Sequence, residues 1–65
     1  NIVSDVIIPL SAQRRRYLLP GGLFICSGII DTRANEVEAA LVKNGLAISA
    51  RLERDGWCAF SAVLE

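Results

Sequence analysis

The chain has 65 residues, of which 52% are hydrophobic and 22% charged, and its seven basic and seven acidic side chains cancel. A chain without net charge has no overall field that would draw it to nucleic acid or to a membrane surface. Since a body of this size buries only about 60% of its unfolded surface, so high an apolar content suggests that part of its apolar surface packs against something absent from the chain.

Residues 2–18 are expected to be helical, in two pieces. Apolar side chains recur at three- and four-residue spacing over the first part of this segment and form one stripe. Pro9 should end or kink the first piece, because proline cannot donate a backbone hydrogen bond. Ser11 can then cap a second short helix, whose C-terminal end suits the arginines at 14–16 as a solvated face. A nucleic-acid patch is the minority interpretation of these arginines, because no second basic cluster supports it.

A Leu-Pro-Gly-Gly turn at residues 19–22 leads into an apolar run at 23–30. The run does not alternate polar with apolar side chains, so it indicates a strand covered on both faces, as in a parallel sheet flanked by helices. A helix is expected from residue 32 to 44, with Gly45 as its stop. Its predicted inner face carries Ala34, Val37, Ala40 and Leu41.

A second strand is expected at 46–53. The Asp-Gly pair at 55–56 favours the turn that matches strand twist, so a third strand follows at 57–64 as the other arm of a hairpin. Both sides of this last strand are mostly apolar, which places it in the centre of the sheet. Trp57 is expected to clamp the sheet edge, with an exposed recognition residue as the less common alternative. Three side chains of the second strand are assigned to one side: Leu46, Ile48 and Leu52.

This order of elements predicts an α/β fold in a single domain over residues 1–65. The strand-helix-strand unit should cross over with a right hand, which makes its two strands parallel. The hairpin then inserts the last strand antiparallel between them, with the helices packed on the sheet.

The residues also resemble a known family. Asn-Ile at 1–2, the segment Leu-Leu-Pro-Gly-Gly-Leu-Phe-Ile at 18–25 and Ser-Gly-Ile-Ile at 27–30 resemble the C-terminal third of the ribosomal-protein-L-eleven methyltransferase family. The resemblance covers essentially the whole chain, and the Glu-Val pair at 36–37 and the Gly-Trp pair at 56–57 also fit it.

The resemblance implies a partial Rossmann-like class I methyltransferase sheet, whose last three strands are present here. It implies an S-adenosylmethionine-dependent parent enzyme that methylates amino groups of a ribosomal protein. The family's glycine-rich cofactor loop and ribose-binding acidic residue would lie upstream. We therefore expect the 65 residues alone to bind no cofactor and to be inactive.

Two positions are candidates for the site of the parent enzyme. Asn1 matches the asparagine that the family places beside the reactive methyl group, where a carboxamide oxygen can accept from the substrate amine and orient its nitrogen. From the residue alone, a chain-end asparagine or a helix N-cap is the alternative. Ser27 would lie at the carboxyl end of a strand, the edge where ligands bind in open α/β sheets, and is a candidate for the substrate cleft.

The two cysteines, Cys26 and Cys58, lie in apolar runs and are interpreted as small buried hydrophobic residues of a reducing cytoplasm. With no histidine and no paired cysteine, neither a metal site nor an activated thiol nucleophile is expected. The apolar runs are far shorter than the roughly 20 residues of a membrane span, and the start lacks the layout of a signal peptide. We expect a cytoplasmic protein without membrane or direct nucleic-acid partners.

Two alternatives to the fragment hypothesis stay open: a free-standing small α/β binding or oligomerisation module without catalysis, and a small nucleic-acid binder that uses the arginines at 14–16. If preceding strands are absent, the strand at 23–30 has an unpaired apolar edge. This predicts a homodimer or a higher oligomer, formed by edge pairing or by exchange of the N-terminal helix.

Overall fold

The computed structural model describes residues 2–65, which form one three-stranded sheet with helices packed against it. The strands at 23–30 and 57–64 coincide with the expected segments, and the expected helix at 32–44 begins with a short 3-10 turn. Within residues 2–65, no helix is long and apolar enough to cross a membrane. In chain order the elements are α1 (Ile2–Ala12), η1 (Arg14–Arg16), β1 (Leu23–Ile30), η2 (Asp31–Arg33), α2 (Ala34–Lys43), β2 (Leu46–Arg54) and β3 (Trp57–Leu64).

The sheet has the strand order β1-β3-β2, and β3 pairs with both neighbours in antiparallel orientation. The last strand is therefore central, as its two apolar sides predicted. Every hydrogen-bonded pair within residues 2–65 is antiparallel, so the expected Rossmann-like sheet is not present in this part of the chain. The hairpin returns β3 into the space between β1 and β2, so these two strands point the same way without bonding to each other.

The turns predicted from the Asp-Gly pair at 55–56 and from the Leu-Pro-Gly-Gly segment at 19–22 are both present. Asp55 and Gly56 both have positive φ, 52° and 83°, as a type I′ hairpin turn requires. In the turn before β1, the amide of Gly22 donates to the carbonyl of Leu19 at 2.8 Å. These turns fix where β1 starts and where β3 folds back on β2.

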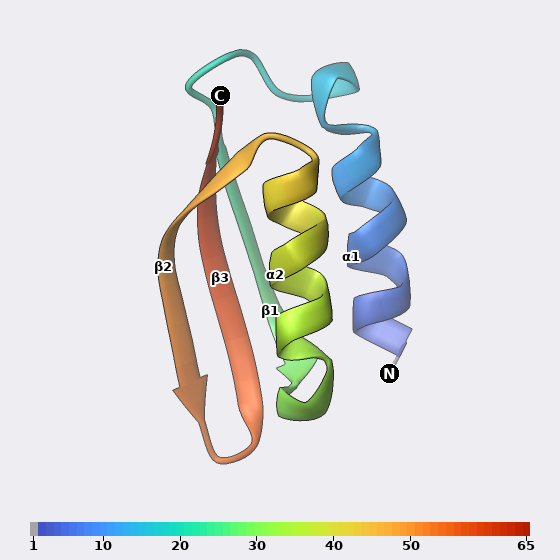
Figure 1. Ribbon diagram of the computed structural model, residues 1–65, viewed down its shortest axis with the longest axis vertical. Coiled ribbons are helices and arrows are strands. Elements are labelled where there is room, and N and C mark those ends of the chain that lie inside the picture. Colours follow the sequence, from blue (N-terminus) through green and yellow to red (C-terminus); the bar gives the residue numbers. More distant parts are fainter. Residues whose placement is uncertain (1) are drawn as a thin grey trace.

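Both helices lie on the same side of the sheet, α1 against α2 and β1, and α2 against β2 and β3 (Figure 1). The opposite face of the sheet, called the open face below, has no helix over it within the described residues. Leu23 and Ile25 on this face are 56% and 70% exposed, so β1 is not covered on both faces as its composition predicted. The core lies between helices and sheet, and its buried side chains include Phe24, Ile29, Val37, Leu41, Leu46, Phe60, Ala62 and Leu64.

Each edge strand carries a β-bulge opposite β3. The register of β1 shifts between Cys26 and Ile29, which brings Ile29 into the core although simple alternation from Cys26 would turn it outward. The register of β2 shifts between Ile48 and Ala50. Because of this shift, Leu52 lies on the open face and is 68% exposed, so its predicted place beside Leu46 and Ile48 is wrong.

Helix α1 continues through Pro9 to Ala12 instead of ending there. Ser11 is fully buried, its Oγ donates to the carbonyl of Ile8 at 2.7 Å, and it accepts from Nδ2 of Asn44 at 3.0 Å. The predicted N-cap role of Ser11 is therefore wrong, because its hydroxyl joins the last turn of α1 to the end of α2. Only the single turn η1 follows, in place of a second helix.

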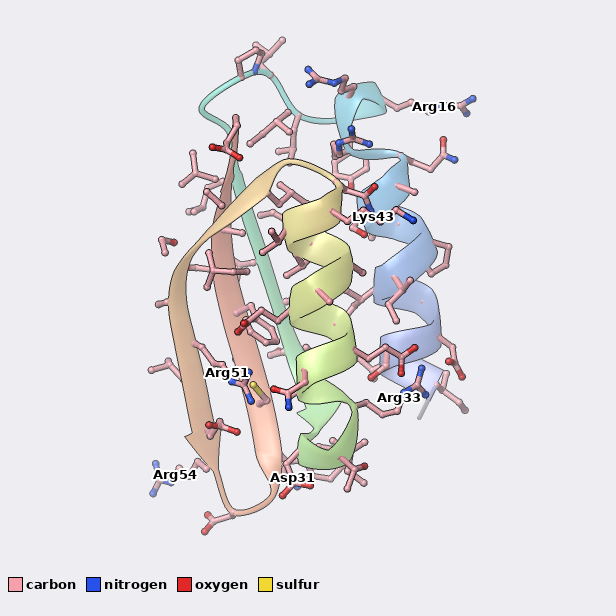
Figure 2. All side chains as sticks on the ribbon, in the orientation of Figure 1. Arg16, Asp31, Arg33, Lys43, Arg51 and Arg54 are labelled. Atoms are coloured by element: carbon pink, nitrogen blue, oxygen red, sulfur yellow. The ribbon has the colours of Figure 1, made fainter. Side chains whose placement is uncertain are left out.

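On the helix side of the sheet, Arg51 of β2 holds the start of α2. Its guanidinium donates to Asn35 at 2.9 Å and to Glu38 at 3.1 Å, and lies over the ring of Phe60 with 5.6 Å to the centroid. Glu53, on the same strand, accepts from Arg51 at 3.1 Å, and Figure 2 shows Arg51 between the strand and α2. The hydrogen bonds to Glu53 and then Glu38 raise the pKa of Arg51. This arginine fixes the helix on the sheet by packing as well as by charge.

Candidate functional site

A hollow of about 270 Å³ lies at the hairpin end of the sheet. There the carboxyl ends of β1 and β2 meet the start of β3, and in α/β sheets this edge is where ligands bind. Two residues of β1 and five of the β2–β3 hairpin line it: Ser27, Gly28, Leu52, Arg54, Trp57, Cys58 and Ala59.

The β1 bulge forms one wall of the hollow. Between Cys26 and Ile29 the strand has one residue more than β3, and Gly28 has φ of +74°. A Cβ added at Gly28 would lie 3.7 Å from Val3, an ordinary contact, so the backbone angle rather than the space favours glycine. Ser27 is exposed at this bulge, and its hydroxyl has no hydrogen-bond partner among residues 2–65. Bulges of this kind often redirect a side chain beside a functional site.

The other wall is apolar and comes from the hairpin. Trp57 is 52% exposed and Leu52 is 68% exposed, and Ala59 is the partner of Leu52 across the strands. A main-chain hydrogen bond of 2.9 Å from Asp31 to the carbonyl of Gly56 joins the end of β1 to the hairpin turn. The walls of the hollow are therefore held on two strands that are linked at their ends.

Arg54 is the charged residue of the lining. Its Nε lies 3.7 Å from the Asp55 carboxylate, but the two side chains are 93% and 88% exposed. So exposed a pair contributes little stability and leaves the guanidinium accessible. Figure 2 shows Arg54 beside the hairpin end, directed away from the helices. The hollow thus combines an apolar wall, a hydroxyl and an exposed cation at its rim.

The residues that the sequence suggested for a site do not all lie at the hollow. Ser27 lines the hollow, and its place in a substrate cleft stays a prediction, whereas Asn1 lies outside the described residues. Trp57 is 52% exposed and lines the hollow on the open face. Sequence reasoning missed Leu52 and Arg54, although the Asp-Gly turn already implied that Arg54 pairs with Trp57.

Both thiols are free and buried. Burial raises the pKa of Cys26 and of Cys58, which keeps each sulfur protonated at neutral pH. They are therefore small packing residues, as interpreted from the sequence. The arginine cluster is different: Arg15 and Arg16 are exposed, and Arg14 donates to the carbonyl of Ala12 at 3.1 Å.

Two apolar features beyond the hollow lack cover within residues 2–65. The edge of β1 that faces away from β3 pairs with no described strand. On α1, Ile2, Val6 and Leu10 form an exposed stripe, with 82%, 57% and 45% of their surface accessible. A free apolar edge beside an apolar helix face is typical of an α/β sheet that continues with a further strand and helix.

The family model described as "Ribosomal protein L11 methyltransferase (PrmA)" matches residues 1–65. Proteins named ribosomal protein L11 methyltransferase from Lachnoclostridium phytofermentans and Halalkalibacterium halodurans are 44% and 45% identical over 62 residues. These matches cover 95% of this chain but 19% and 20% of the relatives. The chain therefore spans about a fifth of the length of the curated relatives it matches.

A solved structure shares the fold. The crystal structure of a ribosomal protein L11 methylase from Lactobacillus delbrueckii subsp. bulgaricus matches with a TM-score of 0.86 at 23% identity. The match covers 94% of this chain and 32% of that chain. The arrangement of helices and strands described above therefore also occurs as part of a larger protein.

Proposed function

Because the chain belongs to the ribosomal protein L11 methyltransferase family, we propose that it forms the C-terminal part of the catalytic domain of an S-adenosylmethionine-dependent enzyme. Its substrate would be a large-subunit ribosomal protein, methylated on amino groups in the cytoplasm. The observation that carries this proposal is the family match over residues 1–65, together with a span of only about a fifth of the relatives.

The uncovered surfaces support a place within a larger sheet. A strand that precedes α1 would pair with the free edge of β1 in parallel orientation, since α1 would then be a right-handed crossover. This extension would make the sheet Rossmann-like, with β3 as the one antiparallel strand between β1 and β2. It would also place further helices over the stripe on α1 and over Leu23 and Ile25 on the open face.

The chemistry of the proposed reaction assigns a role to Asn1. Methyl transfer to an amine requires an in-line approach of a neutral nitrogen, so positioning supplies much of the rate. The Asn1 carboxamide would accept a hydrogen bond from the substrate amine and orient it, without adding charge. Ser27 would line the cleft through which the substrate approaches.

The cofactor is proposed to bind in another part of the enzyme, because the hollow at the hairpin is lined mainly by apolar atoms and offers few polar groups to hold a nucleoside. S-adenosylmethionine would supply the methyl group from a site in the preceding part of the enzyme. The isolated chain is accordingly proposed to be inactive and to bind no cofactor.

A free-standing oligomerisation module is the second candidate function. It is favoured by the same unpaired edge of β1 and the exposed Leu23 and Ile25, which would bury surface between two copies of the chain. The two candidates differ in what completes the sheet: preceding residues of the same protein, or another copy.

In the test, this chain replaces the segment that it matches in the Halalkalibacterium halodurans relative. The joined protein therefore consists of the preceding four fifths of that relative followed by this chain. We expect the joined protein to methylate a ribosomal protein substrate, and Asn1→Ala to lower kcat by about 100-fold while the protein stays folded. The 65-residue chain alone should give no heat of binding with S-adenosylmethionine in calorimetry. A folded joined protein without transferase activity would disprove the proposal, as would micromolar cofactor binding by the chain alone.

A further inference from the structure

We propose that the hollow at the hairpin end of the open face binds an apolar side chain of an extended segment of the protein substrate. This inference rests on the proposed function and adds a recognition site to it. The residues that carry it are Trp57, Leu52 and Ala59 as the apolar wall, with Ser27 and Arg54 at the rim.

The position of the hollow distinguishes it from the rest of the open face. The part around Leu23 and its partner Val63 lies at the opposite end of the sheet, and it is apolar surface that a covering helix would bury. The hollow lies where β1 and β2 end, the edge of an α/β sheet at which substrates meet the catalytic groups. A ligand at this edge is therefore a substrate segment rather than a structural layer of the enzyme.

The size and lining of the hollow define what fits. At about 270 Å³ and with an apolar lining, it has room for one apolar side chain with its adjoining main chain. The exposed face of Trp57 beside Leu52 offers an aromatic and aliphatic surface for an apolar group. Tryptophan is among the residues that most often dominate binding at interfaces, and a bound side chain would bury the exposed half of Trp57.

The polar rim matches a peptide rather than an isolated hydrocarbon. The Ser27 hydroxyl has no partner among the described residues, and the exposed guanidinium of Arg54 has only the weak pair with Asp55 at 3.7 Å. Both groups can donate to main-chain carbonyls on either side of a bound apolar side chain. The cation also favours a segment with an acidic group nearby.

The experiment measures steady-state kinetics of the joined full-length protein on the intact ribosomal protein. Trp57→Ala should raise KM for the protein substrate about 10-fold, with kcat and the KM for S-adenosylmethionine within about twofold of the parent values. Ser27→Ala should raise the same KM by a smaller factor. The matched control is Val42→Ala on the outer side of α2, which removes a side chain of similar exposure, 58% against 52% for Trp57, and should change no kinetic constant.

A second measurement uses the 65-residue chain and does not depend on catalysis. Trp57 is its only tryptophan, so N-acetyl-leucinamide bound in the hollow should shift the emission of this chain, and Leu52→Lys should abolish the shift.

The outcomes separate the possible occupants. An unchanged KM in Trp57→Ala overturns the inference while leaving the proposed transferase intact. A loss of thermal stability with unchanged KM would show that another part of the enzyme fills the hollow, and a change in sedimentation would show that a second copy does. If the parent joined protein folds but transfers no methyl group, the proposed function itself fails, and the fluorescence titration alone decides whether the hollow binds an apolar group.

Discussion

The guanidinium of Arg33 lies 3.0 Å from the carboxylate of Asp5, although 28 positions separate the two residues. The same side chain donates from Nε to Glu36 at 2.7 Å, so it joins α1 to the start of α2. Figure 2 shows Arg33 between these two helices. The hydrogen bond from Arg33 lowers the pKa of Glu36 below its ordinary value.

The first prediction concerns acid stability. A carboxyl whose folded pKa is lowered stabilises the fold above its ordinary pKa, and this contribution is lost as the pH falls through the lowered value. Arg33→Gln should therefore be less stable than the parent chain at pH 7, and the difference should shrink as the pH falls below the ordinary glutamate pKa of about 4.3. Urea unfolding over this range of pH, followed by Trp57 fluorescence, measures the difference. Arg54→Gln is the control, since its pair with Asp55 is almost fully exposed.

The second prediction concerns the core. Leu41 of α2 is fully buried, and Leu41→Ala should cost about 2–5 kcal/mol of unfolding free energy, enough to unfold much of so small a domain. Leu19→Ala removes the same atoms from a side chain that is 80% exposed, and should change stability by less than about 0.5 kcal/mol. Equal effects of the two variants in urea unfolding would contradict the packing described here.

The third prediction concerns the hydrogen bond of 3.0 Å from Asn44 to Ser11. Ser11→Ala leaves the part-buried Asn44 amide without this acceptor and should cost about 1–3 kcal/mol. In a double-mutant cycle with Asn44→Ala, the two losses should be less than additive, because each change already removes the shared bond. Strict additivity would mean that the hydroxyl and the amide stabilise the fold independently.

The fourth prediction concerns the thiols. Since burial raises the pKa of Cys26 and Cys58, the fold disfavours their thiolates. Their contribution to stability is complete below the ordinary thiol pKa of about 8.5 and is lost as the pH rises through the folded values. A thiol reagent at pH 8 should modify both residues slowly in the folded chain and rapidly in urea. Fast modification without denaturant would show that one sulfur is accessible.

The fifth prediction concerns self-association of the isolated chain. Its free β1 edge and open face should produce dimers or larger species at micromolar concentration, and Ile25→Lys should shift the chain towards monomer. Sedimentation velocity resolves the species. Lys43→Gln alters charge at the end of α2, away from this surface, and serves as the control. A parent chain that stays monomeric would remove the oligomerisation module from consideration.

Local patterns predicted the order of elements well. The Asp-Gly pair located the hairpin, and two apolar sides correctly placed β3 in the centre of the sheet. These features depend on residues close in sequence, whose turn geometry and alternation are directly readable. Ser27 was assigned to the strand end for the same reason, and it lines the hollow there.

Features that depend on distant partners were not predictable in this way. Pro9 was expected to end or kink the helix, but α1 does not end there, because Ser11 and the packing against α2 hold its last turn. The coverage of β1 depends on which side of the sheet the helices occupy, and composition does not specify this. The hairpin register places Leu52 and Arg54 at the hollow, whereas the bulge that puts Leu46 and Ile48 on the opposite face from Leu52 has no local sequence marker.

The two bulges have a consequence for insertions and deletions. Side chains alternate along a strand, so a change of one residue reverses inside and outside for everything beyond it. The bulges are exceptions to this rule, because each already holds one extra residue. Loss of Ser49 would leave Leu46 and Arg51 facing the helices on a regularly alternating strand, and loss of Ser27 would likewise keep Ile29 in the core. The length of β1 and β2 can therefore change by one residue at the bulges, whereas the same change elsewhere in these strands would turn buried side chains outward.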